Sequence, residues 1–366
     1  MNHTAPGALR RRLIAAGSLA AAAALAFTGC ASGGSESGSD ANGDEPIGVS
    51  LIVKTTTNPF FVAMQDGAEA AADELGVELT MAAGKEDGDE DTQIQAIENA
   101  ISKGDAGILI TPNGPAVEDA LVKARDAGLY VIALDTPPAD PESVDITFAT
   151  DNFQAGQEIG KWAAAKLDGE KATIALIDLF DDKVVSVDYN RDQGFLDGMG
   201  IDTADKEKNG DEAKTGTYSG GDYEIVGNEA SQGAEDGGRT AAETLLSKNP
   251  DINVVYTINE PAASGAYEAF KAAGTEKGLI MVSVDGGCAG VQQIVDGTLG
   301  ATSQQYPVKM ADLGVQAIYD LVKTDKKPEV TEGLDFYNTG VALVTDDPQD
   351  GVESIDTAAA ADICWG

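Results

Sequence analysis

The sequence predicts an α/β protein made of two doubly wound parallel-sheet domains that follow one another along the chain. From residue 47 onward, short apolar runs alternate with amphipathic stretches of helical length, which is the pattern of strands buried on both faces and of the helices that connect them. Glycines directly follow three of the predicted helices, where a helix end favours left-handed backbone. The length of 366 residues fits about two domains.

The first series of elements occupies residues 47–150. It comprises, in order, strand 47–53, helix 59–75, strand 77–82, helix 91–103, strand 106–111, helix 115–127, strand 129–134 and strand 145–150. Asn58 is a good N-cap and Pro59 suits the first helical position, so the first strand-to-helix turn is locally well specified. The glycines that follow the three helices are Gly76, Gly104 and Gly128.

The second series occupies residues 152–305. It comprises helix 152–167, strand 172–178, helices 185–199 and 232–248, strand 252–258, helix 260–273, strand 279–285, helix 289–296 and strand 300–305. In doubly wound sheets, ligands bind beyond the carboxyl ends of the strands, where the strand-to-helix loops gather. A ligand site is therefore expected at these ends.

Polar residues recur at the predicted strand ends. They are Lys54, Asn58, Thr111, Asp135 and Thr136 in the first series, and Asn259, Asp285 and Gln305 in the second. Asn and Asp also cap helices and fill turns routinely, so a purely structural role stays open for each of them. Their corresponding positions nevertheless indicate one shared binding site.

Two aromatic rings, Phe60 and Phe61, lie on the first turn of the first predicted helix. A single ring beside a sheet is usually part of the core. Two successive residues point in different directions around a helix, so we expect at least one ring to face the space above the strand end.

The N-terminus reads as a targeting segment. Three arginines at 10–12 precede an apolar stretch at 13–28 that is too short for a comfortable membrane span. The segment ends in Phe-Thr-Gly-Cys, which resembles the lipobox of bacterial lipoproteins, although Phe27 stands where leucine is usual. The prediction is a signal peptide at 1–29, a lipidated Cys30 and a flexible Gly/Ser/acid-rich tether over 30–46, with a plain cleaved signal peptide as the alternative.

The composition excludes several functions. A formal net charge of −38 without a basic stripe disfavours nucleic acid and anionic membrane surfaces as partners. The only histidine is His3, inside the predicted signal peptide, which excludes a Ser-His-Asp or Cys-His triad, a histidine general base and a His-ligated zinc site in the mature chain. An enzyme is therefore not expected, the remaining route being a pair of carboxylates such as Asp135 and Asp285.

No cofactor is expected either. The glycines of the 284–290 segment lack both the Walker spacing and the dinucleotide fingerprint. The spaced acids of 202–213 do not form an EF-hand, so this segment is expected to be a solvated loop without a metal.

Two cysteines remain after Cys30. In an exported protein, the even pair Cys288 and Cys364 suggests a disulfide that ties the C-terminus back to the fold. Two unrelated buried thiols are the alternative.

Seven motifs occur together in a specific order. They are KTTTNPFF at 54–61, LDTP at 134–137, ATDN at 149–152, NRDQGF at 190–195, TINEPAA at 257–263, SVDGG at 283–287 and ATSQQYP at 301–307. With them, residues 47–345 resemble the periplasmic sugar-binding proteins of the ribose-binding type, the substrate-recognising components of ABC importers. The similarity is greatest to the fructose-binding members, which end in a similar CWG.

The resemblance implies a type I periplasmic binding protein fold, in which a hinge of three crossings joins two lobes. The crossings are expected near Thr150, Gln305 and Phe336. The N-terminal lobe would then comprise 47–150 and 306–336, and the C-terminal lobe 151–305 and 337–366. The resemblance also implies a monomer whose partners are a sugar and the permease subunits.

The resemblance implies a sugar site built from both lobes. It assigns Asn58, Phe60, Phe61 and Asp135 to the first lobe, and Arg191, Asn259, Asp285 and Gln305 to the second lobe or its hinge. Three positions depart from the ribose-binding pattern. Lys54 replaces a small hydroxyl residue, Thr136 an arginine and Val284 a phenylalanine, with Phe180 as a possible replacement wall.

The predicted ligand is a neutral monosaccharide bound by hinge closure. Asp135 and Asp285 would balance Lys54 and Arg191, leaving a site of about zero charge that suits an uncharged sugar. Fructose is the first choice, and another pentose, hexose or polyol is the alternative. Sensing through a chemoreceptor or kinase is the alternative to import. A sugar-responsive transcription factor shares the fold, but a helix-turn-helix would be needed where this chain has its export signal.

Overall fold

The computed structural model describes residues 46–366. The predicted signal peptide, Cys30 and the predicted tether as far as residue 45 lie outside this part of the chain. Within residues 46–366, the structure contains no helix with the length and apolar character needed to span a membrane.

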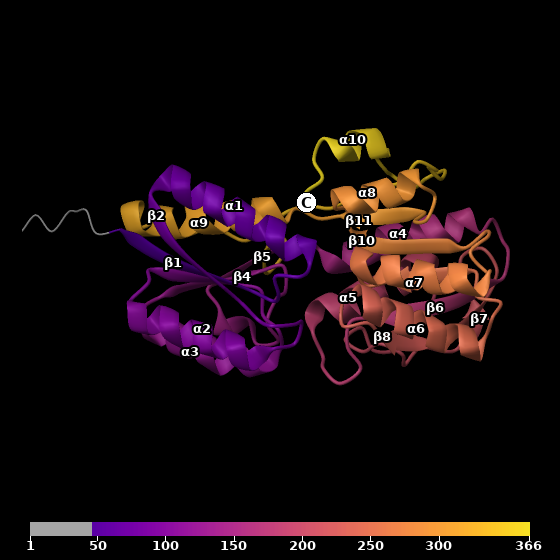
Figure 1. Ribbon diagram of the computed structural model, residues 1–366, viewed down its shortest axis with the longest axis horizontal. Helices are drawn as coiled ribbons and strands as arrows, with labels where there is room; N and C mark the ends of the chain where they lie inside the picture. The colour runs from indigo at the N-terminus through magenta and orange to yellow at the C-terminus, as the bar shows by residue number, and fades with distance from the viewer. Residues whose placement is uncertain (1–45) are drawn as a thin grey trace, which may run out of the picture. The chain divides into compact units, whose positions relative to one another are not determined.

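The first sheet has six parallel strands in the order β12-β5-β4-β3-β1-β2. Its elements are β1 (Ile47–Val53), α1 (Pro59–Leu75), β2 (Val77–Ala83), α2 (Glu90–Lys103), β3 (Gly107–Ile110), α3 (Glu118–Asp126), β4 (Tyr130–Leu134), β5 (Ile146–Ala149), α9 (Pro307–Thr324) and β12 (Tyr337–Asn338), with short 3₁₀ turns at Pro115–Val117 and Pro141–Ser143. Helices α1 and α9 cover one face of this sheet, and α2 and α3 cover the other (Figure 1).

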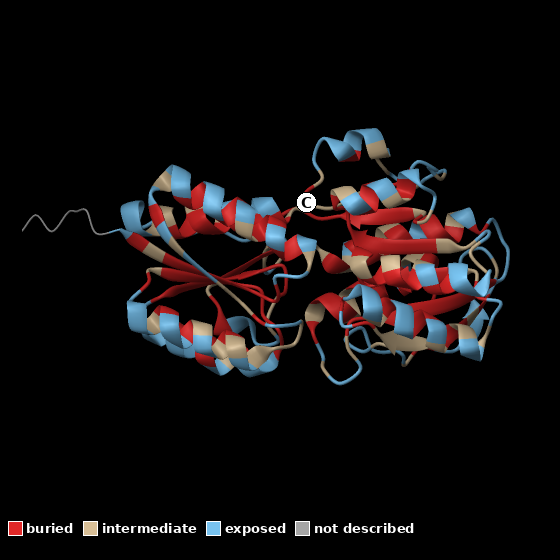
Figure 2. Ribbon diagram, viewed as in Figure 1, coloured by how far each residue is buried: buried red, intermediate tan, exposed pale blue. Residues whose placement is uncertain are grey.

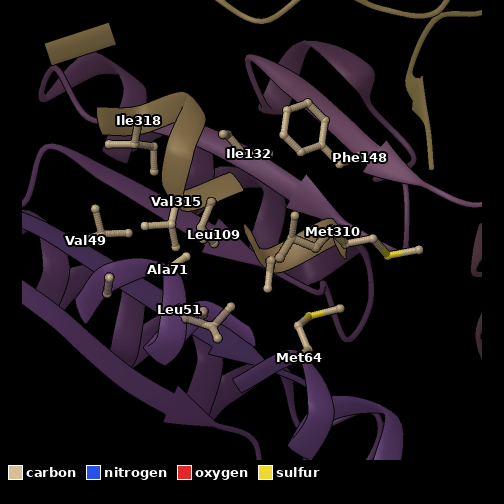
Figure 3. Packing of buried hydrophobic residues seen from close by; sticks show 14 of the residues in the cluster. Val49, Leu51, Met64, Ala71, Leu109, Ile132, Phe148, Met310, Val315 and Ile318 are labelled. Carbon is tan, nitrogen blue, oxygen red and sulfur yellow. The ribbon is translucent and has the colours of Figure 1, made fainter. Parts of the chain in front are cut away.

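Alternation along the strands explains why both faces are apolar. Val49 and Leu51 of β1 point to the α1/α9 side, where they join Met64, Met310 and Val315 in one buried cluster (Figure 3). The next residue, Ile52, belongs to the cluster on the α2/α3 side. The strands are therefore buried on both faces and the outer helix faces are exposed (Figure 2).

The second sheet has seven strands in the order β13-β11-β10-β9-β6-β8-β7. Its elements are α4 (Asn152–Lys166), β6 (Ala172–Asp178), α5 (Ser186–Met199), β7 (Thr215–Thr217), β8 (Asp222–Ala230), α6 (Glu235–Lys248), β9 (Val254–Thr257), α7 (Glu260–Ala273), β10 (Ile280–Asp285), α8 (Cys288–Val295), β11 (Ala301–Gln304), β13 (Ala342–Val344) and α10 (Thr357–Ala361). The interior strands are parallel, whereas β7 and β13 pair antiparallel at the two edges. Helices α4 and α5 pack on one face, and α6, α7 and α8 on the other.

The predicted fold class is confirmed. The chain passes between the sheets three times: after β5, after β11 and between β12 and β13. The third crossing lies a little later than the expected position near Phe336, because Tyr337 and Asn338 still pair with Phe148 and Ala149 of the first sheet. A two-residue strand carries no periodic signal that the sequence could show.

Six helices and strands among residues 46–366 escaped the sequence analysis, and β8 and α9 are the longest of them. Strand β8 lies between the predicted helices 185–199 and 232–248, but it is only half-buried and contains Gly227, where its pairing with β6 shifts register. It therefore lacks the apolar run of a central strand. Helix α9 follows the last predicted strand and returns the chain to the first sheet, where its apolar stripe packs beside α1.

Helices α4 and α5 meet backbone against backbone. A Cβ atom on Gly156 would lie 2.2 Å from the carbonyl oxygen of Arg191, and one on Gly194 would lie 2.3 Å from that of Phe153. Such distances leave no room for any side chain. The glycines therefore set the depth at which α5, and Arg191 on it, lies against α4.

The C-terminal segment is attached to both lobes. Cys288 and Cys364 form a disulfide with Cα atoms 5.0 Å apart. The next residue, Trp365, belongs to the buried cluster of the first sheet and packs edge-on against Phe60 at 5.3 Å between ring centroids. The segment thus runs from a helix of the second sheet to the core of the first.

Candidate functional site

Nine of the eleven predicted ligand-binding residues line one small cavity, which we call the inner cavity. They are Lys54, Asn58, Phe60, Phe61, Asp135, Arg191, Asn259, Asp285 and Gln305. The cavity encloses about 30 Å³, the room of about two water molecules. Its polar groups are bonded largely to one another, as described next.

The loop after β1 and the start of α1 supply one wall. Asn58 is the N-cap of α1, and its Oδ1 accepts a hydrogen bond from Phe60 N at 2.9 Å. The Phe60 and Phe61 rings are buried and meet edge to face at 5.3 Å between centroids. The Lys54 ammonium lies 6.0 Å from the Phe61 centroid, within cation–π range.

Arg191 connects the lobes. Its Nε donates to Asn152 Oδ1 at 2.7 Å. Its Nη1 donates to Ile258 O at 3.0 Å. Its Nη2 donates to Gln305 Oε1 at 3.2 Å and lies 3.6 Å from Asp135 Oδ1. Because Asp135 follows β4 of the first sheet, this ion pair spans the two lobes.

The second lobe contributes a chain of polar side chains at its strand ends. Gln305 Nε2 donates to Asp285 Oδ1 at 3.1 Å, and Asp285 Oδ2 accepts from Glu260 N at 3.3 Å. Asn259 caps α7, because its Oδ1 accepts a hydrogen bond from Ala262 N at 3.0 Å. This is the capping role that the sequence analysis left open for Asn259.

The two carboxylates at the strand ends have unusual backbone. Asp135 has φ +63° and Asp285 has φ +144°, both in the region that favours glycine. Such strain costs of order 1–3 kcal/mol per residue and is typical of functional sites. With this backbone conformation, both carboxylates line the cavity.

Two predicted residues do not line the inner cavity. Thr111 is fully buried at the end of β3, where its carbonyl oxygen accepts from Gln93 Nε2 at 2.8 Å. Thr136 Oγ1 donates to Asp135 Oδ2 at 2.7 Å, so it orients a cavity residue from behind. Phe180, the possible replacement wall, and Val284, a core residue, are also absent from the lining.

The sequence analysis missed four lining residues: Asp87, Leu179, Val187 and Ile258. Asp87 lies in the loop after β2. The sequence analysis named no polar residue there, although ligands bind beyond the carboxyl ends of all strands in such sheets. Its Oδ1 lies 3.9 Å from Lys54 Nζ, and both side chains are buried. The predicted balance of two acids and two bases is therefore wrong, because three carboxyl groups face two cations.

Raised pKa values favour protonation of the carboxyl groups at the site and so reduce its negative charge. Burial raises the pKa of Asp285 to about 7, against the opposing effect of Arg191. Burial also raises the pKa of Asp87, with Lys54 opposing. Burial and the neighbouring Asp285 raise the pKa of Glu260 to about 8, although Thr302 and two backbone N–H groups donate to its carboxylate. The raised pKa values of Asp87 and Asp285 therefore reduce the negative charge of the cavity.

A second group of buried carboxyls adjoins Arg191 in sequence. Asp188 and Asp192 lie on α5, and Asp178 ends β6. Burial, together with the charges of neighbouring carboxyl groups, raises the pKa values of Asp178 and Asp192 well above the usual range. Glu212 is also buried, so the 202–213 segment is not the fully solvated loop that the sequence suggested. Among residues 46–366, no group of three metal-ligating side chains is placed to hold an ion.

These pKa shifts predict that the protein is more stable in mild acid. A carboxyl whose pKa rises on folding contributes stability below its ordinary pKa and loses it as the pH passes the folded value. Those values are about 6 for Asp188, about 7 for Asp285 and about 8 for Glu260. We therefore expect the melting temperature to fall between pH 5 and pH 8.5, measured by calorimetry in high salt to screen the overall charge repulsion.

The matched variants for this prediction are Asp192→Asn and Asp73→Asn. The first keeps the side-chain size but removes a buried titrating group, so it should flatten the pH dependence. The second changes an exposed carboxyl on α1 and should leave the slope unchanged. A wild-type melting temperature that is constant or rises over this range would contradict the prediction.

Together, the fold and the cavity define a class: a two-lobed α/β protein with a small cavity, lined by aromatic rings and hydrogen-bonding side chains, at the carboxyl ends of two sheets. Comparison with known proteins gives the family. The family described as "Periplasmic binding protein domain" matches residues 47–327, and the chain belongs to it.

Individual relatives cover most of the chain. The ribose import binding protein RbsB of Haemophilus influenzae is 29% identical over 279 residues, which is 76% of this chain and 86% of the relative. The D-ribose/D-allose-binding protein of Pseudomonas aeruginosa is 28% identical over 336 residues, 88% and 96% respectively. A solved ABC transporter solute-binding protein from Agrobacterium vitis with bound D-fucose is 26% identical, with a TM-score of 0.70 over 87% of this chain and all of that one.

Proposed function

We propose that this protein is the extracytoplasmic sugar-binding component of an ABC importer and that its inner cavity recognises one neutral monosaccharide ring. One observation carries the proposal. Paired hydrogen-bonding side chains from both lobes meet two buried phenylalanine rings in a single cavity, in a chain whose relatives bind ribose, allose and fucose.

The chemistry of the cavity suits a sugar. A sugar ring has faces of C–H groups and a rim of hydroxyls. Phe60 and Phe61 offer an apolar surface for the faces. Asp135, Asp285 and Arg191 can each engage two neighbouring hydroxyls through charge-assisted hydrogen bonds. A nearly neutral site suits an uncharged ligand better than a sugar phosphate.

Hinge closure is the proposed mechanism. Lys183 Nζ donates to Gly88 O at 2.6 Å, and Ser186 Oγ donates to Pro137 O at 2.7 Å. These contacts link residues of the second lobe to loops of the first, as the Arg191–Asp135 pair does. The inner cavity of about 30 Å³ is too small for a sugar ring, so a ligand must part the lobes to enter and then stabilises a closed form with a wider cavity by contacting both lobes.

Fructose remains the first choice of ligand, supported by the motifs shared with fructose-binding proteins. Lipid attachment at Cys30, location outside the cytoplasm and docking on permease subunits belong to the same proposal.

A thermal-shift screen tests this function. The chain from residue 31 is heated with a panel of ketoses, aldoses, pentoses and polyols. A specific ligand raises the melting temperature progressively with its concentration, because it binds only the folded state. We expect one or a few neutral monosaccharides to do so. A chain that responds to none, and that gives no heat of binding by calorimetry, would refute the proposal.

A further inference from the structure

A second, larger cavity adjoins the inner cavity, and we call it the outer pocket. It measures about 550 Å³, against about 30 Å³ for the inner cavity. Its walls are formed by Pro59, Ala234, Pro261, Ala289, Gln293 and Trp365. It shares Asn58, Asp87 and Asp285 with the inner cavity, so a ligand seated on those residues can extend into both.

The wall on the α8 side is held in place by several independent bonds. The Cys288–Cys364 disulfide joins the first turn of α8 to the C-terminal segment, and Cys288 N donates to Trp365 O at 2.9 Å. The Trp365 indole donates to Gln305 O at 2.9 Å. The Glu260 carboxylate holds the loop before α8 by accepting from Gly286 N and Gly287 N at 2.8 and 3.1 Å.

Such a wall is rigid before any ligand arrives. Rigid walls lower the ordering cost of binding, which is a property of built sites. The volume also falls within the range of about 300–1,000 Å³ that is typical of small-molecule pockets.

The lining has the two kinds of surface that a sugar ring needs. Pro59, Pro261 and Ala289 present apolar patches suited to C–H faces. Between them lie hydroxyl and amide groups, where Gln293 Nε2 donates to Ser264 Oγ at 2.6 Å. All five ionisable side chains of the lining are acidic, so an anionic substituent is disfavoured; they are Glu86, Asp87, Glu235, Glu260 and Asp285.

We infer that the outer pocket is a second sugar subsite, and that the protein takes a neutral disaccharide with one ring in the inner cavity and the other in the outer pocket. This inference rests on the proposed function, because it requires a sugar ring in the inner cavity. It changes the substrate class from free monosaccharides to their glycosides.

The test compares fructose with its disaccharides sucrose, inulobiose and levanbiose by calorimetry. If the screen above selects another monosaccharide, the probes are disaccharides of that sugar. At least one disaccharide should bind about tenfold more tightly than the monosaccharide. Ala289→Trp fills the outer pocket from an exposed position on α8 and should lower the ratio of the two affinities about tenfold. Val295→Trp, on the same helix but outside the lining and 57% exposed, should change neither affinity.

The outcomes separate the two claims. If the wild type binds a monosaccharide but all its disaccharides more weakly, or if Ala289→Trp leaves the ratio unchanged, the outer pocket is not a sugar subsite and the proposed function stands. If the wild type binds no saccharide of either size, the proposed function fails and this inference fails with it.

Discussion

Asp285→Ala should reduce the affinity for the recognised sugar by about a hundredfold or more. The Asp285 carboxylate lines the inner cavity and accepts from Gln305, which in turn accepts from Arg191. Its loss removes the acceptor for two sugar hydroxyls, each such bond contributing about 1.5–3 kcal/mol, and it frees Gln305 to rotate. The measurement is titration calorimetry with the sugar found in the screen.

The fold should tolerate this change, which separates a binding role from a structural one. Burial raises the pKa of Asp285 to about 7, so the native state gains little from its charge. We expect the melting temperature of Asp285→Ala to stay within a few degrees of wild type, and the same-sized Asp285→Asn to lose less affinity. Asp73→Ala, on the exposed face of α1, is the control for losing a carboxylate. Wild-type affinity in Asp285→Ala would remove this residue from the site.

Gly156→Ala should strongly destabilise the second lobe. The new methyl group would lie 2.2 Å from Arg191 O and 2.8 Å from Phe195 N, both backbone atoms that cannot rotate away. Helices α4 and α5 must then move apart, which opens the cluster of Ile159, Phe195 and Leu196 between them. Overpacking that shifts backbone typically costs about 1–3 kcal/mol, so we expect a loss near the upper end of this range. Chemical denaturation measures the loss of unfolding free energy.

The same substitution should also weaken sugar binding, because the displaced carbonyl belongs to Arg191. Lys161→Ala is the matched control, because it also introduces alanine into α4 but on the exposed side of the helix. It should change the free energy of unfolding by less than about 0.5 kcal/mol. If Gly156→Ala unfolds at the same denaturant concentration as wild type, the close contact between α4 and α5 is not required by the fold.

The sequence by itself determined most of the helices and strands and the end of the sheets at which the site is expected. Alternating apolar runs and helices, the Asn58 cap and the polar residues at Lys54, Asp135 and Asp285 are local signals, readable within a few residues of each other. Because parallel strands end at a common edge, those signals also predicted that the residues gather.

Only the tertiary structure decided which residues meet and with what charge. Arg191 and Gln305 are 114 positions apart and bond through side chains, while Trp365 reaches Phe60 from the other end of the fold. Asp87 entered the site, Thr111 was buried away from it, and burial raised the pKa of Asp285. The physical reason is that periodicity and capping act over one or two helical turns. Desolvation and side-chain pairing depend on the packing of segments that the chain brings together only when it folds.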